Sequence, residues 1–126
     1  MAEPPGPAAL DEPAPGAAQA TISTHVLDTE RGLPAAGVRV ALYRLDVGGG
    51  KPIRVSQALT DGDGRIRDLL ERPMQAGDYR LEFDIGEEDD AFFTKVAVDL
   101  RITDTSRSYH VPLLLAPYSV TTYRGS

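Results

Sequence analysis

The most informative absence from this sequence is cysteine, of which the chain has none. Disulfide bonds and thiolate metal sites are therefore excluded, although the lack of cysteine does not report the redox compartment. No apolar run approaches the roughly 18 residues of a membrane-spanning helix. The chain does not start with a basic segment followed by an apolar one, and it does not end in Ser-Lys-Leu, so we expect neither a secretory signal nor a peroxisomal address.

Positive charge is also scarce. The 126 residues include 13 Lys and Arg against 19 Asp and Glu, which gives a net charge of −6. A nucleic-acid-binding protein would need a basic face, so this balance argues against nucleic acid as a partner. The excess of acidic residues is better explained as a contribution to solubility. The length suffices for one domain with its own core and is too short for two of ordinary size.

Large apolar residues are rare in residues 1–20, which also lack Lys and Arg. After the first residue the only large aliphatic side chain there is Leu10, while the same stretch holds half of the prolines in the chain. Such a segment cannot bury enough apolar surface to offset the entropy of ordering it. We predict a disordered, partly polyproline arm over residues 1–20 and a single domain over residues 21–126. The alternative, a proline-rich ligand for a partner, lacks a clean P-x-x-P core with flanking basic residues.

From residue 21 onward, apolar and polar residues alternate with a period of two, which is the pattern of half-buried β-strands. Clusters of Gly, Pro and Asp separate the apolar runs and supply turn chemistry. The runs predict eight short strands, near residues 22–26, 38–42, 53–55, 66–70, 79–85, 96–102, 107–115 and 117–124. Strands with one apolar face each predict an all-β fold in which two antiparallel sheets pack as a sandwich.

The segment GEEDDAFF, at residues 86–93, is the only plausible short helix. Its acidic residues would lie in the first turn, where the helix dipole favours negative charge. The simpler interpretation is a solvated loop that carries two packed phenylalanines. The sequence leaves both interpretations open.

Two histidines are present, His25 and His110. Side chains alternate strictly across a strand. His25 lies on the side opposite to the apolar set of its strand, and His110 shares its side with Pro112 and Leu114. If the more apolar set faces the core in both strands, both histidines point outward onto a partly apolar sheet face. Such a face often marks an interface.

Two other interpretations of the histidines stay open. A lone histidine in a β domain is more often a surface residue, or a half-buried one with satisfied hydrogen bonds, than a catalyst. The pair could also bind a metal together with a carboxylate, but no third ligand is spaced to suggest such a site.

The segment DGDGRI, at residues 61–66, is similar to part of a calcium-binding loop. If Gly64 took the sixth loop position, Leu59 and Leu70 would take the first and twelfth, and neither side chain can bind calcium. The spacing therefore argues against calcium and favours a tight glycine-rich connection ahead of a strand. Periodicity alone gives Arg65 no special role.

Three blocks of sequence together become specific. They are ISTHVLDTERGLPAAGVRVALYR at 22–44, TDGDGRI at 60–66 and YHVPLLLAPYSVTTYRGS at 109–126. In this order they resemble the transthyretin-related enzymes that hydrolyse 5-hydroxyisourate, and the resemblance covers essentially all of residues 21–126. The C-terminal tetrapeptide YRGS is the hallmark that separates these enzymes from transthyretin itself, a hormone carrier with the same sandwich.

The resemblance implies a transthyretin-like antiparallel β-sandwich of two four-stranded sheets. It also implies a homotetramer in which two dimers pack face to face, with the active sites in the channel between them. The departures from the family are modest. Many members have a histidine where Ser108 stands, a Phe-Phe-Pro appears here as Phe92-Phe93-Thr94, and the family core has no counterpart to the proline-rich arm.

The resemblance further implies three central site residues. His25 and His110 match the two active-site histidines of the family, and we expect them to activate water and transfer protons, in roles that the sequence does not divide between them. Arg65 matches the arginine of the DGR motif and is expected to stabilise developing negative charge. All three are also expected to contact the substrate.

The C-terminal tetrapeptide completes the implied site. Ser126 is expected to take part in catalysis by orienting water or substrate. Tyr123 and Arg124 are expected to shape the substrate pocket, with a structural part in ordering the tail as the alternative. The resemblance implies no metal ion and no organic cofactor.

The implied reaction is hydrolysis of the N1–C6 amide bond of 5-hydroxyisourate, which gives 2-oxo-4-hydroxy-4-carboxy-5-ureidoimidazoline. The implied partners are this small molecule and further copies of the chain, with no nucleic acid and no membrane. Family members occur in cytoplasm, periplasm and peroxisomes, and with no visible address we expect this chain in the cytoplasm. The alternative function is a non-catalytic, transthyretin-like carrier of a small ligand, which would have no need of two histidines together with YRGS.

Overall fold

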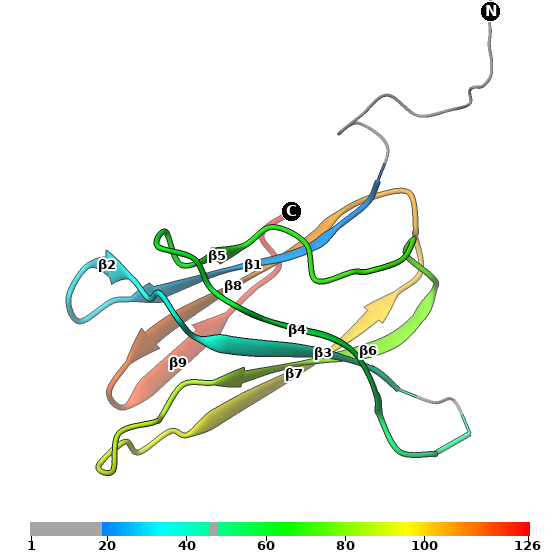
Figure 1. The fold of residues 1–126 in the computed structure, drawn as a ribbon. Helices are drawn as coiled ribbons and strands as arrows, with labels where there is room; N and C mark the ends of the chain where they lie inside the picture. The colour runs from blue at the N-terminus through cyan, green and yellow to red at the C-terminus, as the bar shows by residue number, and fades with distance from the viewer. Residues whose placement is uncertain (1–18, 46–47) are drawn as a thin grey trace, which may run out of the picture.

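Two β-sheets packed face to face form the fold in the computed structural model, which describes residues 19–45 and 48–126. The strands are β1 (Ile22–Asp28), β2 (Leu33–Pro34), β3 (Arg39–Leu45), β4 (Ile53–Leu59), β5 (Arg65–Ile66), β6 (Gly77–Asp84), β7 (Lys95–Ile102), β8 (Tyr109–Ala116) and β9 (Ser119–Thr122) (Figure 1). The described residues contain no helix, so the all-β prediction is confirmed, and none of them forms a helix able to span a membrane. The arm predicted for residues 1–20 lies outside the described residues except for its last two.

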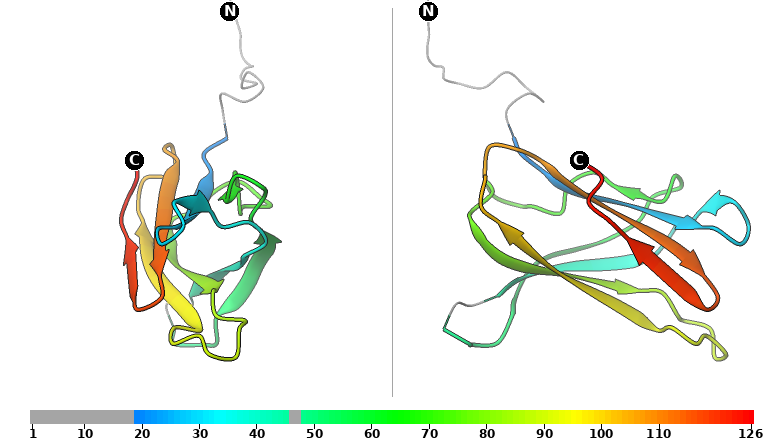
Figure 2. Two further views of the ribbon diagram at one scale, coloured as in Figure 1. Left: turned by 90° about the vertical axis from the view of Figure 1, so that its left-hand side faces the viewer. Right: turned by 180° about the vertical axis from the view of Figure 1, so that it is seen from behind.

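The sheets differ in their strand order. One sheet has the order β2-β1-β8-β9, with β5 also paired to β1, and the other has the order β4-β3-β6-β7. Figure 2 shows the two layers from the end and from behind. Paired strands are antiparallel, as predicted, except for β1 and β8, which are parallel. These two strands lie near opposite ends of the sequence, so no tight hairpin forces them to be antiparallel.

The sheet that contains β1 has five strands where four were expected. Two strands of two residues each share one edge of β1: Leu27 and Asp28 pair with β2, and Thr24 and His25 pair with β5. The strand expected near residues 66–70 is only the two-residue β5, and the chain leaves the sheet after it. The turn expected between the first two strands supplies β2.

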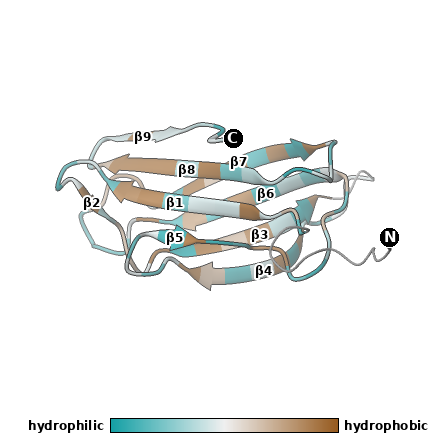
Figure 3. Cartoon of the chain, turned by 90° about the horizontal axis from the view of Figure 1, so that it is seen from above, coloured by the Kyte–Doolittle hydropathy of each residue, from teal (hydrophilic) through white to brown (hydrophobic). Residues whose placement is uncertain are grey.

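The core lies between the sheets and follows the alternation of the sequence. In β6, Tyr79, Leu81 and Phe83 are buried, whereas Arg80 and Glu82 between them are half-buried on the other face. Each fully buried apolar side chain stabilises the fold by about 1.5–3 kcal/mol relative to exposure. This burial fixes which face of every strand points outward. Figure 3 shows the apolar and polar segments along the strands, with β8 the most continuously apolar.

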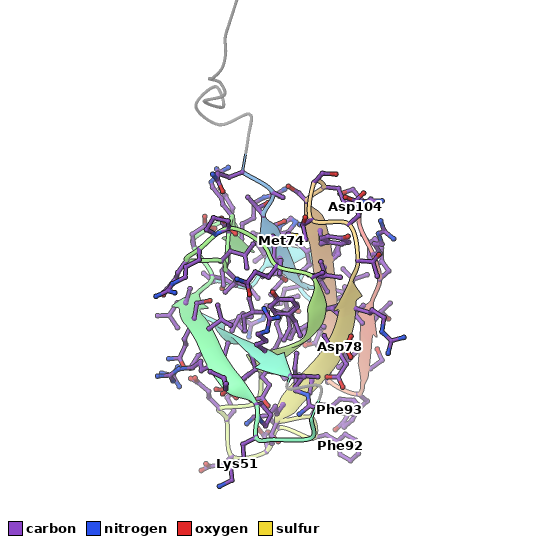
Figure 4. All side chains as sticks on the ribbon, turned by 90° about the vertical axis from the view of Figure 1, so that its right-hand side faces the viewer. Lys51, Met74, Asp78, Phe92, Phe93 and Asp104 are labelled. Atoms are coloured by element: carbon purple, nitrogen blue, oxygen red, sulfur yellow. The ribbon has the colours of Figure 1, made fainter. Side chains whose placement is uncertain are left out.

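Residues 86–93 form a loop between β6 and β7, so the simpler of the two interpretations of this segment is confirmed. The rings of Phe92 and Phe93 pack edge to face with their centroids 4.9 Å apart. The ring of Tyr118 lies 6.0 Å from that of Phe92. Both phenylalanines lie at the end of the sandwich opposite to Asp104 (Figure 4). The segment therefore adds an aromatic cluster to the surface at this end.

Both histidines point away from the core, as predicted. Buried and half-buried residues alternate along the first part of β1, and His25 is one of the half-buried residues. His110 is half-buried too, next to the buried Val111. Pro112 differs from expectation, since it is buried although it shares the outward side with His110. The reason is its place in the middle of the sheet, where β8 lies between β1 and β9.

Candidate active site

The turn that precedes β5 brings Arg65 next to β1. The Asp61 carboxylate accepts hydrogen bonds from the backbone N–H groups of Asp63 and Arg65, both at 2.9 Å. Gly64 has a φ of 77°, and its carbonyl oxygen accepts the Val26 N–H at 2.7 Å. A β-carbon at Gly64 would lie 2.4 Å from the Val26 carbonyl oxygen. Glycine is therefore what allows the turn to approach β1 so closely.

The acidic side chain of this turn serves local structure. A hydrogen bond from the backbone N–H of Arg65 is the main cause that lowers the pKa of Asp61. The carboxylate is thus held ionised as an acceptor for its own turn, in the manner of an Asx-turn. Within the described ranges, no group of three or more His, Asp or Glu residues is arranged to hold a metal ion.

Arg65 and His25 face each other across the β1–β5 pair. Their Cα atoms are register partners in this antiparallel pair, an arrangement that brings the Cβ atoms within about 4.5–5.5 Å. Arg65 is exposed and His25 is half-buried. The two side chains therefore start next to each other on the outer face of the sheet.

His110 joins them from the other side of β1. The parallel pairing of β1 and β8 places His110 beside Ser23, which lies two residues before His25 on the same face of β1. The Ser23 Oγ and the His110 Nδ1 are 2.8 Å apart, a hydrogen-bond distance. Three groups thus share one outer face, carried by β5, β1 and β8. We call Arg65, His25 and His110 the polar row.

The members of the polar row interact electrostatically. Burial lowers the pKa of His110 below its ordinary value of 6.5, and electrostatic interactions with Arg65 and His25 lower it further. A lowered pKa keeps the imidazole neutral near pH 7, where it can accept a proton and then pass that proton on. The permanent charge of Arg65 alongside can stabilise an anion. The arrangement is therefore able to move protons and to hold developing negative charge.

The C-terminal residues pack against the start of β8. The Gly125 N–H donates to the His110 carbonyl oxygen at 2.7 Å, and a β-carbon on Gly125 would lie 2.6 Å from His110 Cδ2. The Arg124 guanidinium carbon lies 5.5 Å from the centroid of the Tyr109 ring. The Arg124 Nε donates to the Ser126 carbonyl oxygen at 3.5 Å. The tail therefore reaches the polar row through the backbone of its glycine.

Among the described residues, the other predicted site residues make no hydrogen bond to a side chain of the row. Tyr123 and Ser126 are exposed, and in the part of the chain that the structure describes neither one hydrogen-bonds to a side chain of the polar row. The contacts of Arg124 are with the ring of Tyr109 and with the tail itself. These contacts favour a part for Arg124 in ordering the tail.

The polar row stands on an open sheet face in the single chain. A hollow of about 320 Å³ opens beside β7, and its lining includes Leu100, Tyr109, His110, Tyr123 and Arg124. The other two members of the row do not line it. A larger hollow of about 540 Å³ lies beside the 86–93 loop and contains neither the row nor the tail. Carboxylates in its lining would repel an anionic ligand. They are those of Asp28, Glu30, Asp84, Glu87, Glu88 and Asp90.

Two residues at this site have no role in the sequence-based prediction. Ser23 shares its side of β1 with His25 by simple alternation, but its contact with His110 depends on the register of β1 and β8, which periodicity does not reveal. Gly125 belongs to the YRGS block, yet nothing in the block alone assigns its glycine a function. The structure explains why this residue is glycine: there is no space for a β-carbon beside the His110 imidazole.

Comparisons with known proteins agree with one another. The chain matches the HIUase/Transthyretin family over residues 22–125. It is 44% identical to the 5-hydroxyisourate hydrolase of Deinococcus radiodurans, over 83% of this chain and 95% of that protein. The solved structure of Klebsiella pneumoniae 5-hydroxyisourate hydrolase is similar with a TM-score of 0.74 and 34% identity, over 86% of this chain and 100% of that one. Sea bream transthyretin in complex with thyroxine is similar with a TM-score of 0.74 and 29% identity, over 82% of this chain and 93% of that one.

Proposed function

The chain belongs to the HIUase/Transthyretin family, and from this premise we propose that it hydrolyses 5-hydroxyisourate in urate catabolism. The observation that carries the proposal is the polar row, in which two imidazoles and a guanidinium share one outer sheet face. Hydrolysis of a cyclic amide needs an activated water, stabilisation of an oxyanion and a proton for the leaving nitrogen. The row offers a suitable group for each of these tasks.

The proposed steps follow from the chemistry of the amide. Water adds to C6, the N1–C6 bond breaks and N1 takes up a proton, so that the ring opens to 2-oxo-4-hydroxy-4-carboxy-5-ureidoimidazoline. One imidazole of the row removes the proton from the attacking water, and the other supplies the proton to N1. The lowered pKa of His110 keeps its imidazole neutral near pH 7, which is the form that accepts a proton from water. The imidazole that supplies the proton to N1 must first be protonated.

Arg65 stabilises the negative charge that develops on the oxygen of C6. Its guanidinium is always charged and presents a planar set of donors that suits carbonyl and urate-like oxygens. Ser126 orients water or substrate, and Tyr123 and Arg124 form part of the pocket wall. The stacking of Arg124 over Tyr109 supports a second task for Arg124, which is to hold the tail in place.

The proposed assembly is a homotetramer with its sites between two dimers. The polar row is open to solvent in the single chain, whereas the reaction benefits from a site that excludes bulk water. Leu27 and Leu114 are half-buried register partners on the same outer face. Packing two dimers face to face would cover these leucines and enclose the row, which supports a shared channel.

We assign the hydrolase domain to residues 21–126 and propose that the reaction does not need residues 1–20. The family match over residues 22–125 supports this boundary. The cytoplasm stays a prediction for the compartment, and fractionation of the source cells would test it.

A carrier of a small ligand is the second candidate function. It is favoured by the likeness to sea bream transthyretin, which was solved in complex with thyroxine. A carrier has no need of a neutral imidazole beside a guanidinium, and for this reason the hydrolase is the better-supported function. Thyroxine binding without any effect on 5-hydroxyisourate would favour the carrier.

A direct assay tests the proposal. Uricase converts urate to 5-hydroxyisourate in the cuvette, and the decay of its ultraviolet absorbance is followed with and without the protein. We expect faster decay with the protein, and a loss of roughly 10²–10⁴-fold in rate for His110→Ala, the range of a general acid or base. An unchanged decay rate with the wild-type protein would refute the hydrolase. A loss below about threefold in His110→Ala would reduce His110 to a packing residue.

A further inference from the structure

We propose that Ser23 and Gly125 are positioning residues that hold the His110 imidazole from two sides, so that Nε2 is its only ring nitrogen open to a reactant. The inference rests on the proposed hydrolase function and adds to it. In it, Ser23 of β1 and Gly125 of the tail both fix the orientation of the His110 ring. Neither residue is expected to touch the substrate.

Ser23 occupies one ring nitrogen. Its Oγ lies 2.8 Å from His110 Nδ1, in a part-buried place between β1 and β8. In the described residues this is the only side-chain hydrogen bond of Ser23. A hydroxyl can donate or accept, so the bond persists whether or not Nδ1 carries a proton. Ser23 can therefore keep the ring in one orientation before and after His110 takes up a proton.

Gly125 occupies the opposite edge of the ring. Its N–H donates to the His110 carbonyl oxygen, which fixes the tail against the strand. A β-carbon there would lie 2.6 Å from Cδ2 and 3.3 Å from Cγ of the imidazole. No side chain therefore fits between Gly125 and the Cγ–Cδ2 side of the ring. Ser23 holds Nδ1, whereas Nε2 makes no hydrogen bond within the described residues.

Without such contacts the ring would not keep one orientation. The torsion between the β-carbon and an imidazole is broad and roughly two-fold, so a loosely held ring can turn over, which puts Cδ2 in the place of Nδ1 and Cε1 in the place of Nε2. Proton transfer needs the reacting atoms within hydrogen-bond reach. A misplacement of about 1 Å can cost roughly 10²-fold in rate. Holding His110 on both edges is thus a direct contribution to turnover.

The test compares three serine variants in the uricase-coupled assay. Ser23→Ala removes the bond to Nδ1 and is expected to lower kcat roughly 10- to 100-fold with little change in KM. Ser23→Thr retains the hydroxyl and is expected to recover most of kcat. Ser108→Ala is the matched control, because the Ser108 Oγ accepts the Thr21 N–H at 2.9 Å and so joins the same two segments without touching the ring.

A second readout does not depend on activity. Nitrogen NMR of the His110 imidazole reports hydrogen bonding at each ring nitrogen. We expect the Nδ1 resonance to move in Ser23→Ala and to stay in place in Ser108→Ala. This measurement separates the two proposals, since the contact with Ser23 can be present even if the wild-type protein fails to accelerate decay of 5-hydroxyisourate.

Four results would overturn the inference. The first is a kcat for Ser23→Ala within about twofold of the wild type, and the second is a Ser108→Ala variant as slow as Ser23→Ala. The third is an Nδ1 resonance that does not change when Ser23 is replaced. A slow Ser23→Ala that Ser23→Thr fails to recover would also count against it, because the hydroxyl would then not be the group that matters.

Discussion

At the scale of single residues, His110 combines several constraints that act in the same direction. Burial disfavours its charged form, and so do its electrostatic interactions with Arg65 and His25. The Ser23 hydroxyl holds one ring nitrogen and Gly125 packs on the ring edge. The result is an imidazole that is neutral and fixed in orientation, which is the state that proton transfer requires.

The lowered pKa predicts the acid limb of the pH profile. The neutral imidazole of His110 persists below its ordinary pKa of 6.5, because the charged form is disfavoured in the folded protein. We expect the acid limb of kcat/KM to have its midpoint below pH 6.5. Steady-state rates across the acid range, with circular dichroism to confirm folding, provide the measurement. A midpoint at or above 6.5 would contradict the shift.

Arg65 should affect that profile through its charge. Replacement by Gln removes a cation that lowers the pKa of His110, so the acid limb of Arg65→Gln is expected at higher pH than in the wild type. The maximal rate should fall as well, since the oxyanion loses its partner. Arg67→Gln is the control, because Arg67 is a nearby exposed cation that is not among the causes of the lowered pKa of His110. An acid limb that moves equally in both variants would point to net charge as the cause.

Gly125 should tolerate no side chain. A β-carbon 2.6 Å from His110 Cδ2 is closer than real contacts allow, so either the ring or the tail must move in Gly125→Ala. We expect kcat to fall roughly tenfold or more, with the circular dichroism spectrum unchanged because the residue lies outside the core. Wild-type turnover in this variant would show that the contact between glycine and imidazole is not needed.

At the scale of elements, the turn before β5 determines where Arg65 lies. Gly64 has a φ of 77°, and an added β-carbon would meet the Val26 carbonyl oxygen at 2.4 Å. Gly62, in the same turn, has nothing within 4 Å of the corresponding position and no positive φ. Each glycine of DGDG follows an aspartate, but only Gly64 occupies a position that requires glycine.

This difference gives a paired prediction. Gly64→Ala should lower the free energy of unfolding by about 1–3 kcal/mol, the cost of a strained backbone conformation, and should lower the rate as β5 moves away from His25. Gly62→Ala should change the free energy of unfolding by no more than about 0.5 kcal/mol, as for ordinary surface substitutions. Urea unfolding measures both. Equal effects of the two substitutions would disprove the role assigned to the turn.

The C-terminal tail is the second element with a prediction of its own. Deletion of residues 124–126 removes the contact of the tail with His110, together with the Arg124–Tyr109 stacking. We expect most of the turnover to be lost while the β-rich circular dichroism persists. A truncated protein with full activity would show that the tail is not part of the site.

At the scale of the whole molecule, the open position of the polar row leads to a prediction about assembly. Light scattering should give a mass about four times the 13.5 kDa of the chain, because the proposed site is enclosed only between dimers. Removal of residues 1–20 should leave both this assembly and the rate unchanged. A monomer with full activity would refute the shared channel, and a loss of rate on removing the arm would refute the proposed domain boundary.

The sequence by itself determined the fold class and the outward direction of the histidines. Alternation with period two requires that Tyr79, Leu81 and Phe83 share a face, and burial then decides that this face is the inner one. The same alternation, applied to the strands of His25 and His110, predicted that both imidazoles point away from the core. The sequence blocks also indicated which residues to consider together, through their resemblance to one family.

Only the tertiary structure decided which of these residues are neighbours. The parallel pairing of β1 with β8 and the short β5 set the registers that place Arg65, His25, Ser23 and His110 in order. Register between strands far apart in the chain depends on how the two sheets pack, which local periodicity does not encode. The space available to Gly125 and the lowered pKa of His110 arise from the same packing. Alternation along one strand is a local property, whereas proximity between strands belongs to the folded chain as a whole.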